Sequence, residues 1–234
     1  MDRHLDRAGR SRSQIIVMSR PAPAYIPVET IANLPLEHAW DDYDPYVAIG
    51  DPDERVVEKL ETVSLKSVLA FALASTEWIL YRLKNHTDFD LPWQYVDAQW
   101  ASLVTWKLSY LWDPGHENTE GPVRGPIDMA VRQITNCHRA LKLAEGEVDA
   151  ALIGRVAEYI LPDPKAFLSW QDQALERLAR FYPRDEYGFG PSTPREALDP
   201  GVEMTVESGI VLAEEYVRTL DFSQNEFLNA KALL

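Results

Sequence analysis

Cysteine is almost missing from this sequence, in which Cys137 is the only one among 234 residues. A single cysteine excludes an intramolecular disulfide and a thiolate-rich zinc site. It also fits a reducing compartment, so we expect a cytoplasmic protein. Long apolar runs are missing as well. No stretch of about 18 apolar residues occurs, and we therefore expect no membrane-spanning segment.

Basic residues are outnumbered, with 23 lysines and arginines against 37 aspartates and glutamates and a net charge of −14. Residues 1–20 nevertheless hold five arginines and two aspartates, so the rest of the chain is more acidic than the total. An acidic body repels phosphate backbones and anionic headgroups. We therefore expect no nucleic-acid or membrane partner, and a basic protein partner or a cationic ligand fits better. Solubility alone would account for the same charge.

Strand signals are scarce, because alternating β-branched runs bounded by turn residues hardly occur. Helical periodicity instead recurs from about residue 52 to the end, in a chain that is 46% apolar. The sequence predicts an all-α fold, a single-domain bundle of about six to eight helices over residues 21–234. Residues 1–20 hold only the short apolar patch "IIVM", too little for a secretory signal. We expect them to be a disordered basic segment, and either Met1 or Met18 fits the start of translation.

Prolines and capping residues place the first elements. Five prolines between residues 21 and 50 predict an irregular N-terminal arm, which its apolar residues should hold against the helices. Asp51 and Pro52 predict the start of a helix, which either ends near Thr62, with Ser64 placed to cap the next helix, or continues beyond it. Residues 65–83 are apolar in almost every direction, which predicts the central helix of the bundle.

The remaining helices are predicted from apolar spacing and from proline and glycine breaks. A tryptophan-rich helix is expected over 92–112, and Pro126 is expected to start the helix after it. Further helices are expected near 148–160, 163–181 and 206–220. Four prolines and three glycines in residues 183–202 predict a long loop.

The stretch "AWDDYDPYVAIGDPDE", from Ala39 to Glu54, places six carboxylates beside three aromatic rings. Its "DDYD" resembles the aspartate-rich motif of prenyl-diphosphate and terpene enzymes. The spacing differs, however, Pro45 argues against that motif's helix, and no second acidic motif occurs. The calcium loop of an EF-hand is not matched either. No phosphate loop, dinucleotide fingerprint or nucleophile elbow is present, so we expect no metal or cofactor and lean against an enzyme.

Aromatic rings surrounded by carboxylates are typical of a surface that binds a basic protein: the rings contribute contact area and the charges steer the encounter. The sequence therefore predicts a partner-binding surface made of Trp40, Asp41, Asp42, Tyr43, Asp44, Tyr46, Asp51 and Asp53. A small acidic helical protein without a catalytic motif resembles, in general character, a bacterial immunity protein or antitoxin. That resemblance implies that the chain neutralises a cognate toxin by occluding its active site.

The alternative is a helical enzyme or small-ligand-binding protein. Its pocket would lie between helix 92–112 and the loops 113–126 and 183–202. The residues with suitable chemistry there are His116, Glu117, Arg124, His138 and Glu77. A deep cavity with a polar lining would favour this interpretation, whereas a filled core and a charged surface would favour the first.

Overall fold

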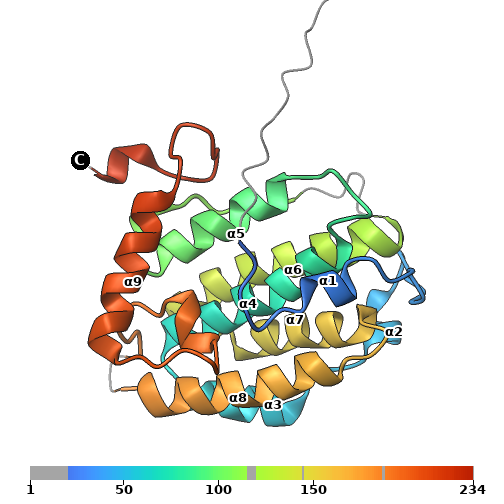
Figure 1. Cartoon of the computed structure of the whole chain (residues 1–234), viewed down its shortest axis with the longest axis horizontal. Coiled ribbons are helices and arrows are strands. Elements are labelled where there is room, and N and C mark those ends of the chain that lie inside the picture. The colour runs from blue at the N-terminus through green and yellow to red at the C-terminus, as the bar shows by residue number, and fades with distance from the viewer. Residues whose placement is uncertain (1–20, 115–119, 144, 186–187, 234) are drawn as a thin grey trace, which may run out of the picture.

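The computed structural model describes residues 21–114, 120–143, 145–185 and 188–233, so the expectation for residues 1–20 lies outside it. Within the described ranges the chain forms nine α-helices and no strand, which confirms the all-α, single-domain bundle (Figure 1). The helices are α1 (Val28–Ile31), α2 (Pro45–Ile49), α3 (Glu54–Glu61), α4 (Leu65–Leu83), α5 (Leu91–Ser102), α6 (Gly121–Ala140), α7 (Glu147–Ile160), α8 (Lys165–Phe181) and α9 (Val206–Thr219). None of these helices combines the length and the apolar character needed to cross a bilayer.

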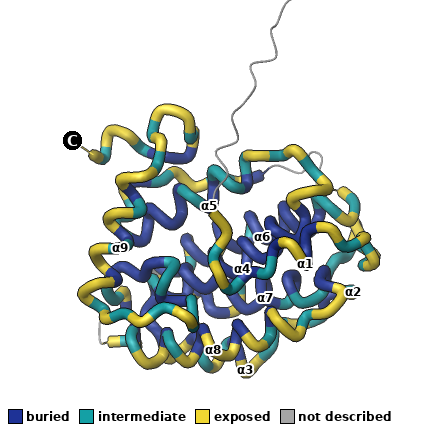
Figure 2. The backbone as a smooth tube through the Cα atoms, in the orientation of Figure 1, coloured by how far each residue is buried: buried dark blue, intermediate teal, exposed yellow. Residues whose placement is uncertain are grey.

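Helix α4 is the centre of the bundle, as the sequence predicts. Every residue of α4 except Lys66 is buried, and α5, α6, α7 and α8 all pack against it (Figures 1 and 2). The Ser64 side chain caps its first turn by accepting a hydrogen bond from the N–H of Ser67. Because other helices cover it on every side, α4 has no face left for solvent.

One arginine inside this core joins the N-terminal arm to the helices. The guanidinium of Arg82, near the end of α4, is fully buried and donates to four backbone carbonyls. These belong to Ile31 (3.2 Å), Leu34 (3.0 Å), Pro35 (2.7 Å) and Ile160 (3.3 Å). Since helix-terminal carbonyls have no partner within their own helix, Arg82 satisfies the ends of α1 and α7 together. Its burial lowers the pKa of Arg82 below the usual range.

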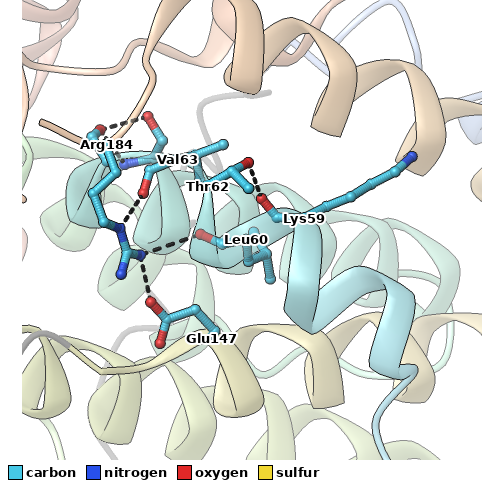
Figure 3. Close-up of polar contacts among 8 residues, drawn as sticks. Lys59, Leu60, Thr62, Val63, Glu147 and Arg184 are labelled. Carbon is cyan, nitrogen blue, oxygen red and sulfur yellow. Dashed lines mark hydrogen bonds and ion pairs between the residues drawn. The ribbon is translucent and has the colours of Figure 1, made fainter.

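A second arginine closes the junction between α3, α4 and α7 (Figure 3). Arg184 donates to the carbonyls of Leu60 (3.2 Å) and Val63 (2.9 Å) and forms an ion pair with Glu147 at the start of α7. Two more arginines bind carbonyls of other segments, Arg155 that of Ile49 and Arg177 those of residues 197 and 202. Four arginines are thus used to tie the backbone together.

Two predicted helix starts are wrong. The helix expected from Asp51 begins at Glu54, because the carboxylate of Asp53 accepts the N–H of Arg55 (2.9 Å) and caps the helix instead. The helix expected from Pro126 begins five residues earlier, at Gly121, and keeps Pro126 inside it. Of the two alternatives left open for this helix, an end near Thr62 is the one observed, since α3 ends at Glu61.

The helix expected over 92–112 is also wrong at its end, since α5 stops at Ser102. Residues 108–110 lie antiparallel to residues 227–229: the N–H of Tyr110 donates to Phe227, and that of Asn229 to Leu108, both at 2.8 Å. Trp112 then packs on the ring of Phe227, 5.1 Å between centroids. These distant contacts outweigh the helical preference of the segment. The loop expected between α8 and α9 is present and contains one turn of 3-10 helix, η3 (Arg195–Leu198).

Replacing Arg82 by Met should lower the free energy of unfolding by about 3 kcal/mol or more, because four carbonyls lose a charged donor in a dry environment. Urea denaturation measures this loss. Arg180→Met, at an exposed position of α8, is the matched control and should change stability by less than about 1 kcal/mol. Equal losses in the two variants would contradict the role given to Arg82.

Candidate functional site

The candidate site stands on the arm between residues 36 and 53, which is attached to α6 and α7 at several points. The first attachment is made by His38, whose Nε2 donates to the carbonyl of Pro122 (2.7 Å). That carbonyl lacks its usual partner because Pro126, four residues later in α6, has no N–H. His38 therefore satisfies the acceptor that the internal proline leaves open. Burial lowers the pKa of His38, which favours its neutral form.

Trp40 and Asp42 make the next attachments. The indole of Trp40 is half-buried and lies so close to α6 that a Cβ on Gly125 would stand 2.0 Å from its Nε1. The carboxylate of Asp42 accepts the N–H of Gly121 (2.7 Å), at the start of the same helix. Both side chains belong to the predicted partner-binding set. In the structure, Trp40 and Asp42 both contact α6 and hold the arm against it.

Between these attachments and α3, the chain turns outward and presents apolar side chains to solvent. The carboxylate of Asp41 accepts the N–H groups of Tyr43 (2.8 Å) and Asp44 (3.1 Å), which fixes the turn before α2. Tyr43 is 98% exposed, Val47 77% and Tyr46 52%. We call Tyr43, Tyr46 and Val47 the aromatic ridge.

The ridge is held on its far side as well. The N–H₂ of Gln133 on α6 donates to the hydroxyl of Tyr46 (3.4 Å), and Arg155 on α7 donates to the carbonyl of Ile49 at the end of α2 (3.0 Å). The Tyr159 hydroxyl donates to the carbonyl of Ala39 before the ridge. The ridge therefore projects from a segment that is fixed at both ends.

The carboxylates near the ridge differ in what they contact. Those of Asp44 and Asp51 make no hydrogen bond or ion pair with any residue in the described part of the chain. The carboxylate of Asp53 is occupied, since it caps α3 and pairs with the Arg55 guanidinium (3.0 Å). The hydrogen bond from Arg55 lowers the pKa of Asp53. Only part of the predicted set is thus open to a partner.

The residues suggested for a pocket mostly have structural contacts. Glu77 is fully buried and accepts from Trp100 Nε1 (2.9 Å) and Arg195 (3.0 Å). His138 is buried, with its Nδ1 2.6 Å from Gln99 Oε1. The guanidinium of Arg124 lies 3.7 Å from the centre of the Phe89 ring and 3.5 Å from Asp128, and burial raises the pKa of Asp128. His116 and Glu117 lie outside the described residues.

The space around the tryptophan-rich helix is small. A hollow beside Trp100, Arg195 and Tyr216 measures about 10 Å³, roughly the room for one water. A larger hollow of about 140 Å³ lies beside α6 and Asp113. Among the described residues, no group of three His, Cys, Asp or Glu side chains is arranged to hold a metal ion.

A second acidic region lies far from the ridge. Glu207, Glu214 and Glu215 are exposed on α9, which stands at the opposite end of the bundle from α2 in Figure 1. One partner that covers the ridge would therefore leave α9 free. The sequence does not distinguish the two regions, because both are acidic and contain apolar residues.

Val47 is the exposed residue that the sequence prediction omits. It lies in the same short helix as Tyr46 and is more exposed than that ring. Tyr43 lies in the turn before α2, so the four-residue spacing does not place it on one helix face with Val47, and helical periodicity gives no signal for Val47.

No protein-family model, curated protein or solved structure matches this chain in the comparisons made with each. A function therefore has to be argued from the chemistry and geometry of the site itself.

Gly125→Ala should destabilise the protein by about 1–3 kcal/mol, because the new methyl group overlaps the Trp40 indole. In a Trp40→Ala background the same change should stabilise by up to about 1 kcal/mol, since Ala favours a helix more than Gly does. Urea denaturation of the two single variants, the double variant and the parent measures this change of sign. Additive effects would contradict the contact.

Proposed function

We propose that this chain is a protein-binding module that docks a basic partner protein through the aromatic ridge. The observation that carries the proposal is the exposure of Tyr43, Tyr46 and Val47 on a segment fixed at both ends, beside the unpaired carboxylates of Asp44 and Asp51. Exposed aromatic residues of this kind are enriched at the energetic centres of protein interfaces.

The attachment of the arm supports docking because it limits the entropy lost on binding. A loop that orders only in the complex loses conformational freedom at that moment, whereas this ridge is already held by α6 and α7. Binding would then bury the rings of Tyr43 and Tyr46 without first folding the segment. Such preorganised surfaces change little when their partner arrives.

The charge of the chain supports a cationic partner. The net charge is −14, and the guanidiniums of Arg82, Arg155, Arg177 and Arg184 all donate to backbone carbonyls, although those of Arg155 and Arg184 also pair with a glutamate. Asp44 and Asp51 would pair with lysine or arginine side chains around the docked ridge and raise the rate of encounter. Nucleic acid, which carries phosphates, does not fit this surface.

Among basic partners, a toxin is the proposal we favour. The filled core around Glu77 and Trp100 fits a binding protein better than an enzyme, and a small acidic helical chain has the general character of bacterial immunity proteins. The ridge would enter the substrate site of the toxin and block it, with the carboxylates meeting the cationic groups that line that site. Neutralisation would take place in the cytoplasm.

The double variant Tyr43→Ala/Val47→Ser should weaken partner binding by at least about tenfold, because it removes the two most exposed side chains of the ridge. The partner is captured from a native lysate on the parent chain, identified, and then expressed with and without each variant. The supporting result is that the captured protein stops growth, and that the parent chain restores growth while the double variant does not.

The matched control is Ile210→Ala/Val211→Ser on α9, which removes exposed apolar groups at the other end of the bundle. It should protect as well as the parent chain. Equal protection by the ridge variant, or capture of a protein that leaves growth unaffected, would defeat the proposal. Thermal melting confirms that both variants remain folded.

Asp44→Asn/Asp51→Asn should slow association with the captured partner by several-fold at low salt, and this difference should shrink as salt is added. The dissociation rate should change less, because the carboxylates act mainly at long range. Surface plasmon resonance over a series of salt concentrations measures both rates. A salt dependence identical to that of the parent chain would argue against electrostatic steering.

A further inference from the structure

The hollow beside α6 has a polar and partly cationic lining that the proposed docking does not use. It measures about 140 Å³ and is lined by Asp113, Arg132, Thr135, Asn136 and Arg139. Since a water molecule takes up about 30 Å³ in the liquid, this space exceeds that of several waters. It is the more spacious of the two hollows described above.

Four of the lining residues follow one face of α6. Residues 132, 135, 136 and 139 are spaced three and four apart, so their side chains lie above one another along the helix. Arg132 and Arg139 stand at the two ends of this row, two helical turns apart, with a hydroxyl and an amide between them. The Thr135 hydroxyl already donates to the Trp112 carbonyl (2.6 Å), so the donors that the row offers to a small ligand are the Arg139 guanidinium and the Asn136 amide, with the positive charge of Arg132 nearby.

The cationic character of the hollow is opposed by a single lining carboxylate. Asp113 stands 3.9 Å from the Arg139 guanidinium, and the two side chains are 71% and 52% exposed. An ion pair this long and this exposed contributes little free energy. Asp113 is therefore only a weak competitor for Arg139 when an anion enters the hollow.

We propose that this hollow binds a small oxyanion, a phosphate or carboxylate group on a free small molecule. The Arg139 guanidinium can recognise both through paired N–H···O hydrogen bonds, and the exposed Asn136 side-chain amide, one turn earlier on α6, completes the contacts. An anion can bind at this place on an acidic protein because the side chains that line the hollow include two arginines and one aspartate. This inference does not depend on the docking role of the ridge.

A chain of hydrogen bonds leads from the hollow toward the ridge. The Asn136 Nδ2 donates to Gln133 Oε1 (3.2 Å), and the Gln133 Nε2 donates to the Tyr46 hydroxyl (3.4 Å). An oxyanion that takes a hydrogen bond from Asn136 changes the surroundings of Gln133. The side-chain amide signals of these two residues therefore report binding without any partner protein.

Titration of the full chain with inorganic phosphate, followed by nitrogen–proton NMR at low ionic strength, tests the site. Saturable shifts are expected at the Asn136 side-chain amide and at the Arg139 Nε–H. A parallel titration with acetate separates the two ligand sources, because saturation by either anion supports the site and identifies the group that it prefers. Saturation by neither anion would overturn the proposal.

Arg139→Gln should weaken the binding by at least about fivefold, because it removes a charged donor. Arg180→Gln changes the net charge equally, at an exposed position on α8, and should leave the affinity unchanged. Equal weakening in the two variants would mean that the anion responds only to overall charge and would overturn the site.

Asp113→Asn gives a change in the opposite direction. Removal of this carboxylate should tighten anion binding by about two- to threefold, since Arg139 loses its internal competitor. Asp163→Asn, which removes an exposed carboxylate beside Lys165, is the matched control and should have no such effect. The same affinity in Asp113→Asn and Asp163→Asn would show that Asp113 does not face the ligand, and the assignment would fail.

Discussion

The buried guanidinium of Arg82 is the interaction on which the arrangement of this protein depends. The N-terminal arm brings its own apolar residues to the bundle, but it also brings carbonyls that no helix can satisfy. Arg82 takes up those of Ile31, Leu34 and Pro35 and, with the same group, the last carbonyl of α7. A buried cation without a carboxylate is costly unless several oxygens surround it, and these four provide that surrounding. The arm and the helices are therefore one packing unit.

The candidate site is held in place because the arm that carries it is part of this packing unit. Pro126 deprives Pro122 of a hydrogen bond and His38 supplies one, so an irregularity of α6 becomes an attachment point for the arm. Gly125 follows the same logic, because only a residue without a side chain lets the Trp40 indole approach the helix so closely. His38 of the arm thus binds the carbonyl that α6 leaves without a partner, and Trp40 fills the space beside its glycine. What projects beyond them, the aromatic ridge, is held firmly although it has few contacts of its own.

The parts of this fold that depend on neighbouring residues could be predicted from the sequence. The parts that depend on contacts between distant residues could not. Ser64 and the apolar residues 65–83 identify the central helix, because the capping residue and the residues that become buried follow one another in the sequence. Pro126 misled the prediction, since a proline normally marks a helix start and here a histidine 88 residues earlier compensates for it. The exposed rings were expected, but Trp40 was not expected to pack on α6. Its neighbour there is a glycine, which carries no periodic signal. The partner-binding role itself stays a prediction.

The antiparallel contact between residues 108–110 and 227–229 has a consequence for biosynthesis. Tyr110 and Asn229 are 119 positions apart, so the first of them leaves the ribosome long before the second has been made. During that interval Tyr95 and Trp112 lack the ring of Phe227 that later covers them. Domains emerge from their N-terminal side, and apolar surface exposed at this stage attracts other chains. This part of the nascent protein is where we would look for the binding of a chaperone.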